Sequence, residues 1–291
     1  MSAESPPSTG NPRGMAHVRT HTGQEKSAIR VVITGKGGVG KTTLTALLAH
    51  HFAREGLHVL AVDGDPQQNL AVTLGISPER AEAIVPVADH AGYIREKTGA
   101  GADDLPGGLL RLNPNVSDVV ERFAVPVDRN IRVLVMGGVR QAGSGCLCPA
   151  YTLLSAILRR FRFFREDVIL LDTPAGLEHF GRAVADGFSV ALVVADPSYN
   201  ALSVARQSAK LARDLAISEV ILVVNRMGGS DDESGIRQKI GDMSAFTRTI
   251  LIPYDPELSG FGPSVKDLFL RESPFAEKLR DLAEIIQVRQ T

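Results

Sequence analysis

Apolar residues occur along this chain in short continuous runs that are separated by longer amphipathic stretches. Runs such as those at 168–171 and 220–224 are apolar at every position, which is typical of strands covered on both faces of a sheet. We therefore predict strands at 29–33, 58–63, 109–112, 131–136, 168–172, 190–195, 220–225 and 249–252.

Helical patterns fill the intervals between these strands. After the first strand, Leu44, Leu47, Leu48 and Phe52 fall on one helical face before Gly56 ends the helix. Further helices are predicted at 151–161 and 202–215. Alternating strands and helices favour an α/β fold, with a doubly wound, mostly parallel sheet and helices on both faces.

The two ends of the chain differ in character. Residues 1–27 are rich in proline, glycine and small polar residues, and we predict a disordered N-terminal tail. Residues 28–291 contain no internal repeat and are predicted to form one domain. Near the C-terminus, Phe275, Leu279, Leu282 and Ile286 form an apolar face among mixed charges, which favours a core-packing helix over a lipid anchor.

Composition narrows the classes of partner. The 291 residues carry 32 basic and 33 acidic side chains, so the net charge of -1 gives no general reason to bind nucleic acid or a membrane. No apolar run approaches the roughly 20 residues that span a bilayer, and the N-terminus lacks the apolar core of a signal peptide. We expect a cytoplasmic protein whose partners are proteins.

The loop after the first strand has the composition of a phosphate-binding loop. Its residues are Gly35, Lys36, Gly37, Gly38, Val39, Gly40, Lys41 and Thr42, followed by Thr43. The glycines let backbone amides converge on a phosphate, and the helix N-terminus adds positive potential. Lys41 is expected to pair with the β- and γ-phosphates, and the Thr42 hydroxyl with a phosphate-bound Mg²⁺. The spacing predicts a P-loop NTPase that binds a nucleotide, with Thr43 beside it.

Two further segments follow strands of the predicted sheet. Asp63 and Asp65 come at the end of the second strand, and Asp172 ends the strand at 168–172. Carboxyl ends of parallel strands meet at one edge, so these carboxylates are candidates to hold Mg²⁺ through water or to orient an attacking water. An isolated aspartate at a strand end is more commonly a helix cap or a turn residue.

The only two cysteines, Cys146 and Cys148, are one residue apart in a glycine-containing loop before the helix predicted at 151–161. Thiolate metal sites commonly use four donors, so two chains related by a twofold axis could complete one site. Metal binding is favoured over a redox disulfide or idle thiols, and nickel or zinc would both suit the donors.

Lys36, the second lysine of the loop, links the chain to a known superfamily. A second lysine at this place resembles the deviant Walker A ATPases, which include MinD, ParA and the nitrogenase iron protein. The resemblance implies that Lys36 reaches the nucleotide of the opposite subunit in an ATP-bridged homodimer. It further implies that Asp65 orients the hydrolytic water and that Asp172 supports Mg²⁺. A solvated side chain is the alternative for Lys36.

Asn225 and Pro253 extend the same resemblance to the base. Asn225 ends a strand and is similar to the family's adenine-reading asparagine, because an amide can donate and accept at the adenine edge. No guanine-specific aspartate follows Arg226 at the required spacing, which favours ATP. Pro253 resembles the segment that packs beside adenine. A plain turn residue is the alternative for Asn225.

Additional segments resemble the CooC family, the nickel-inserting maturation ATPases of carbon monoxide dehydrogenase. They are residues 95–99, 112–114, 146–149, 176–179 and 252–254, and the likeness spans about 28–260. It implies a nucleotide- and metal-dependent homodimer that binds nickel, or zinc, through Cys146 and Cys148 and serves carbon monoxide dehydrogenase as client. His179 is expected to be a switch or packing residue instead of a ligand.

Two alternatives belong to other functional classes. A reductase like the nitrogenase iron protein would hold an iron–sulfur cluster between subunits. The cysteines of that family are widely separated, with one directly before the segment that corresponds to 172–176, and this chain has none at that place. A positioning ATPase of the MinD or ParA type would bind membrane or DNA instead. Both remain open on sequence grounds.

Overall fold

The computed structural model describes residues 28–99, 114–137, 152–153, 156–157, 167–176, 188–228, 232–260, 262, 264–266, 268 and 272–288. Within them the strands are β1 (Ile29–Gly35), β2 (Val59–Asp63), β3 (Val125–Pro126), β4 (Ile131–Val135), β5 (Val168–Asp172), β6 (Val190–Ala195), β7 (Glu219–Met227) and β8 (Arg248–Pro253). They form one eight-stranded sheet in the order β3-β4-β2-β5-β1-β6-β7-β8.

The sheet is parallel except at one edge. Every pair from β4 to β8 runs parallel, and only β3 pairs antiparallel, with β4. Strand β1 lies in the interior between β5 and β6, so the loop that leaves it emerges at the middle of the carboxyl edge. Loops from β2, β5, β6 and β7 leave from the same edge, where ligands of open α/β sheets bind.

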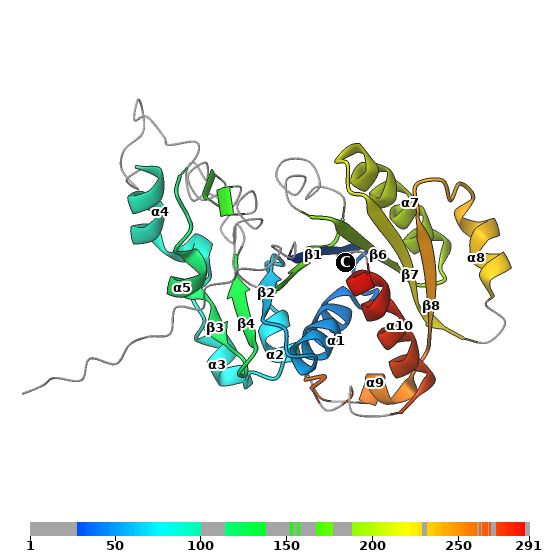
Figure 1. Cartoon of the computed structure of the whole chain (residues 1–291), viewed down its shortest axis with the longest axis horizontal. Helices are drawn as coiled ribbons and strands as arrows, with labels where there is room; N and C mark the ends of the chain where they lie inside the picture. The colour runs from blue at the N-terminus through cyan, green and yellow to red at the C-terminus, as the bar shows by residue number, and fades with distance from the viewer. Residues whose placement is uncertain are drawn as a thin grey trace, which may run out of the picture.

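Helices cover both faces of this sheet (Figure 1). The described helices are α1 (Lys41–Arg54), α2 (Leu70–Thr73), α3 (Pro78–Glu82), η1 (Val87–Asp89), α4 (Ala91–Thr98), α5 (Val119–Phe123), α7 (Tyr199–Asp214), α8 (Glu233–Ile240), α9 (Pro256–Gly260) and α10 (Pro274–Val288). Helices α1 and α10 pack against each other, and α7 lies on the other side of the sheet. The short helices α3, α4 and α5 gather beside β3 and β4.

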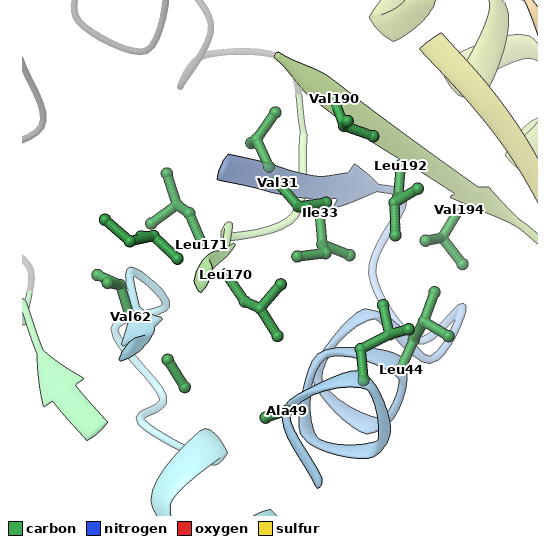
Figure 2. Packing of buried hydrophobic residues seen from close by; sticks show 14 of the residues in the cluster. Val31, Ile33, Leu44, Ala49, Val62, Leu170, Leu171, Val190, Leu192 and Val194 are labelled. Carbon is green, nitrogen blue, oxygen red and sulfur yellow. The ribbon is translucent and has the colours of Figure 1, made fainter. Parts of the chain in front are cut away.

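The core forms where α1 packs on the central strands. Figure 2 shows Leu44 and Ala49 of α1 facing the side chains of Ile33, Leu170 and Val194. All seven residues of β1 and all five of β2 and β5 are buried, which explains why most of the residues in these strands are apolar. A strand buried on both sides holds the loop at its end in a fixed place, and that is the structural basis of the site below.

The predicted fold class is confirmed: the sheet is mostly parallel and doubly wound, with helices on both faces. Every predicted strand in the described residues is present, with ends that differ by at most three residues. The strand predicted at 109–112, most of the helix at 151–161 and the tail at 1–27 lie outside the described residues. None of the helices of the described chain is long and apolar enough to cross a membrane.

Several short elements were not predicted from the sequence, whereas the buried apolar face of α10 was. Helices α2 to α5 and strand β3 each have five or fewer residues, apart from α4, and such lengths leave little periodicity to detect. The C-terminal stretch forms α10, whose Phe275, Leu279, Leu282 and Ile286 are all buried. The prediction of a core-packing helix is therefore confirmed.

Candidate functional site

The candidate site lies where β1, β2 and β5 end together. The register pairs Asp63 at the end of β2 with Asp172 at the end of β5, and Asp172 with Ile33 in β1. The loop after β1 starts two residues beyond Ile33. The strand pairing therefore gathers the predicted phosphate loop and the predicted carboxylates in one place.

Backbone conformation shapes the loop between β1 and α1. Gly35, Gly38 and Gly40 have φ values of 144°, 82° and 99°, which L side chains rarely adopt. At Gly35 a Cβ would also collide with the carbonyl oxygen of Val194 in the adjacent β6. Helix α1 begins after Gly40 with no side-chain cap and no acidic residue in its first turn. Its N-terminal amides and positive potential are thus suited to an anion.

The two lysines of the loop differ in exposure. Lys41 is only 7% exposed, and its Nζ donates to the carbonyl oxygen of Lys36 at 3.2 Å. Burial lowers the pKa of Lys41, while Asp172 and Asp65 act in the opposite direction. Lys36 itself is exposed on the loop. One lysine is therefore held inside the loop, whereas the other faces outward.

Asp172 is a buried carboxylate with an incomplete set of partners. Its Oδ2 accepts a hydrogen bond of 2.6 Å from the Thr42 hydroxyl, while its Oδ1 is buried without a hydrogen-bond partner. Burial raises the pKa of Asp172 to about 7. A buried carboxylate oxygen and a hydroxyl side by side fit Mg²⁺, which takes few protein ligands and retains several waters. The donor set is therefore suited to a magnesium–nucleotide complex.

Asp65 and the segment around it lie against β5. The amide of Gly64 donates to the carbonyl oxygen of Asp172 at 2.9 Å, which ties the start of this segment to the end of β5. The carboxylate of Asp65 is partly exposed and accepts a hydrogen bond of 2.9 Å from the amide of Gln67. Asp65 and Asp172 thus lie on adjoining segments at the phosphate loop, as predicted.

Asp63 was noted in the sequence as a carboxylate at a strand end, but it was given no role of its own. It is fully buried, and its two carboxylate oxygens accept hydrogen bonds from the amides of Asp65 and Leu70, each at 3.0 Å. Burial raises the pKa of Asp63 to about 6. The signal available in the sequence was the acidic residue two positions before Asp65, at the last position of an apolar strand.

A pocket adjoins the phosphate loop on the side of β7 and β8. Asn225 and Arg226 from β7 line it, with Ile252, Pro253 and Tyr254 from the end of β8 and Thr43 from α1; α9 and α10 each contribute a side chain. The Nδ2 of Asn225 donates to the carbonyl oxygen of Val39 at 2.9 Å. The three residues predicted beside the nucleotide, Thr43, Asn225 and Pro253, therefore line one pocket next to Gly40.

The structure does not test the predicted thiolate site. Cys146 and Cys148, and His179, lie outside the described residues. Among the residues that the structure does describe, no group of three or more histidine, cysteine, aspartate or glutamate side chains could hold a metal ion. The cysteine pair therefore stays a prediction from the sequence.

Comparison with known proteins agrees with this geometry. Residues 30–261 match the CbiA family, the CobQ/CobB/MinD/ParA nucleotide binding domain. The carbon monoxide dehydrogenase accessory protein CooC of Rhodospirillum rubrum is 39% identical over 204 residues, covering 70% of this chain and 76% of that protein. An uncharacterized ATP-binding protein of Methanocaldococcus jannaschii is 36% identical over 234 residues, covering 79% of this chain and 87% of its own.

A solved structure supports the fold. The septum site-determining protein MinD of Pyrococcus horikoshii, solved as a complex with Mg-ADP, has a TM-score of 0.60 and 22% identity and covers 89% of this chain and 96% of its own. The nucleotide-binding family and the ATP-binding relatives show that this protein is an ATPase that uses ATP or ADP. The chain belongs to the CobQ/CobB/MinD/ParA nucleotide-binding family and, within it, to the CooC group.

Proposed function

We propose that this ATPase is a metallochaperone that uses ATP to control a nickel site shared by two copies of the chain. In this proposal Lys41 holds the β- and γ-phosphates, and Thr42 and Asp172 hold Mg²⁺, Asp172 through water. Asp65 orients the water that attacks the γ-phosphate. Lys36 reaches the nucleotide of the second copy, and its exposure on the loop supports that role because a buried lysine could not cross an interface.

The proposed base site is the pocket beside the phosphate loop. Asn225 reads the adenine edge there, and Thr43 and Pro253 flank the nucleotide. One amide hydrogen of Asn225 donates to Val39, which leaves its second amide hydrogen for a ligand. The hydrogen bond also ties the base pocket to the phosphate loop, so occupation of one supports the conformation of the other.

The proposed cargo is nickel, held by Cys146 and Cys148 of each copy. Four thiolates from two chains satisfy a soft or borderline cation, and zinc would compete for them. The relative from Rhodospirillum rubrum is an accessory protein of carbon monoxide dehydrogenase, so we propose that enzyme, or a related nickel enzyme, as the client. The chaperone would work in the cytoplasm, where thiols remain reduced.

One observation carries the proposed link between nucleotide and metal. The amide of Met136, directly after β4, donates to the carbonyl oxygen of Asp63 at 2.9 Å. Met136 precedes the segment that contains both cysteines, whereas Asp63 precedes Asp65. One backbone hydrogen bond therefore ties the start of the segment with the cysteines to the strand end that carries Asp63, two residues before Asp65.

Replacement of the cysteines tests the metal site itself. The double variant Cys146→Ser, Cys148→Ser should lose stoichiometric nickel while its affinity for ATP stays within about twofold, because the phosphate loop is unchanged. Ser144→Ala, in the same segment, is the matched control and should bind nickel as the natural chain does. Stoichiometric nickel in the double variant, measured by metal analysis after gel filtration, would refute the assignment.

A further inference from the structure

Asp63 is bonded to both ends of the segment that carries Asp65. Its Oδ1 accepts from the amide of Asp65 and its Oδ2 from the amide of Leu70, the first residue of α2. Both bonds are 3.0 Å, and the carboxylate is fully buried. One side chain thus holds the two ends of a six-residue segment in a fixed relation.

The segment between those ends also has turn bonds of its own, because the carbonyl oxygen of Asp65 accepts from the amide of Gln68 at 3.0 Å and its carboxylate from the amide of Gln67 at 2.9 Å. Residues 66, 67 and 69 are exposed, and Gln68 adopts a φ of 56°, which a non-glycine side chain seldom takes. The N-cap residue of α2, Asn69, makes no side-chain capping bond, so the Asp63 carboxylate supplies the acceptor for the amide of Leu70. The bonds from Asp63 therefore support both ends of a mostly exposed segment that contains a strained residue.

Asp63 is also fixed by the strands on each side. It pairs with Asp172 in β5, and its carbonyl oxygen accepts from Met136 after β4. Because the carboxylate is rooted in the buried strand β2, any force on the segment 65–70 is opposed by the sheet. A charged acceptor makes stronger bonds to backbone amides than a neutral one.

We propose that Asp63 is a positioning residue for ATP hydrolysis: its carboxylate clamps the segment 65–70 so that Asp65 is held where the attacking water must be oriented. Asp63 does not touch the nucleotide in this proposal and acts through Asp65. The inference rests on the role proposed for Asp65. It predicts that loss of the clamp slows the chemical step and spares ATP binding, since the phosphate loop after β1 is separate from this segment.

The test compares Asp63→Asn, Asp65→Asn and the double variant by steady-state ATPase kinetics. Asparagine keeps the shape of Asp63 but turns one acceptor into a donor that faces an amide. We expect Asp63→Asn to lower kcat by about tenfold or more and to change KM by less than about threefold. The double variant should be no slower than Asp65→Asn, because a residue that acts through Asp65 has nothing left to position.

Asp167→Asn is the matched control. Asp167 also accepts a backbone amide bond, from His58 at 2.8 Å, but at the opposite end of β2, so its variant should keep the natural kcat. The clamp proposal would be refuted if the losses of kcat in the two single variants multiplied in the double variant. It would also be refuted if KM of Asp63→Asn rose by as large a factor as its kcat fell. If Asp65→Asn alone keeps the natural kcat, the role of Asp65 fails instead.

Hydrogen exchange on the unaltered chain tests the clamp without any variant. The amides of Asp65 and Leu70 should exchange slowly, and the amide of Gln67, which bonds only to the side chain of Asp65, should exchange fast. Equally fast exchange at all three amides would overturn the proposal even if Asp63→Asn fails to fold.

Discussion

The phosphate end and the base end of the nucleotide site are built in opposite ways. At the phosphate end, Lys41, Asp63 and Asp172 are nearly or fully buried, and each side chain makes a hydrogen bond within the site. At the base end, Tyr254 is 50% exposed and Arg226 is exposed at an irregularity in the pairing of β7 with β8. The first end is rigid and charged, and the second is open and mostly neutral.

Because of this difference, we expect catalysis and nucleotide affinity to be controlled at different ends of the site. Buried charges are costly in the free chain and become favourable only when phosphate and Mg²⁺ arrive, so the phosphate end should govern the rate of hydrolysis. The contacts that an open, mostly neutral pocket makes with the base are the same before and during the reaction. The base end should therefore govern the affinity for the nucleotide. Substitutions at the two ends should therefore separate kcat from Kd.

The largest effect is expected from Lys41→Ala. Removal of a preorganised cation at the phosphates should lower kcat by about 10³-fold. The control Lys210→Ala removes an exposed lysine of α7, 58% exposed in its side chain, and should change nothing measurable. ATPase assays at saturating ATP provide the comparison. If Lys41→Ala kept more than a tenth of the natural kcat, the phosphate end would not govern the rate of hydrolysis.

The second largest effect is expected from Asp172→Asn, which should lower kcat by about 10²-fold. The same variant should make the nucleotide-free chain more stable. The raised pKa of Asp172, about 7, means that folding favours the protonated carboxyl. This contribution to stability is complete below the unfolded pKa of 3.8 and is lost as the pH rises through about 7. Asparagine stays neutral, so the variant should gain on the order of 2 kcal/mol at pH 8 and almost nothing at pH 4.

Denaturant unfolding of the nucleotide-free chain at pH 8 and pH 4 measures that gain. Thr173→Ser, at the next position, keeps a hydroxyl that can donate to the carbonyl oxygen of Ile33 and serves as the control. An Asp172→Asn variant that is less stable at pH 8 would show that the buried carboxylate is not a cost to the fold.

Asn225→Ala should affect binding instead of rate. The loss of one good hydrogen bond to the base corresponds to about tenfold weaker ATP binding, with kcat at saturation within about twofold. Since Asn225 also bonds to Val39, inorganic tripolyphosphate, which has no base, provides the discriminating ligand. Calorimetry should show weaker ATP binding and unchanged tripolyphosphate binding. Equal losses for both ligands would place the effect at the phosphate loop.

Ala216→Gly should give the smallest effect and act at neither end. Ala216 has a φ of 59° between α7 and β7, and glycine adopts this conformation without strain. We expect a gain of about 0.5 kcal/mol in unfolding free energy, with unchanged kcat and Kd. A change in kcat or in Kd would show that the phosphate end and the base end of the site are coupled through the start of β7.

The sequence predicted the phosphate end better than the base end for a physical reason. The glycines and Lys41 are adjacent in sequence because one continuous loop wraps the phosphates, so a local pattern identifies them. The base pocket joins residues from α1, β7, β8, α9 and α10, and the sequence indicated Thr43, Asn225 and the segment at 252–254 among them. The pocket contributions of Leu258 and Phe275 depend on tertiary packing that no local pattern encodes.

The specific role of Asp63 was not predicted from the sequence, for a related reason. An aspartate at a strand end is compatible with a cap, a turn or a catalytic role, and only the bonds to Asp65 and Leu70 distinguish them. The short helices near β4 were missed because their contacts with the sheet, not their periodicity, hold them in place.

In the proposed function, the state of the nucleotide sets the affinity for nickel in a pair of chains. The most direct measurement is a nickel titration with a non-hydrolysable ATP analogue, with ADP and without nucleotide, combined with the native mass of each sample. The account predicts one nickel per two chains and an affinity that differs at least about tenfold between nucleotide states. A single chain that binds nickel equally tightly in all three samples would contradict it.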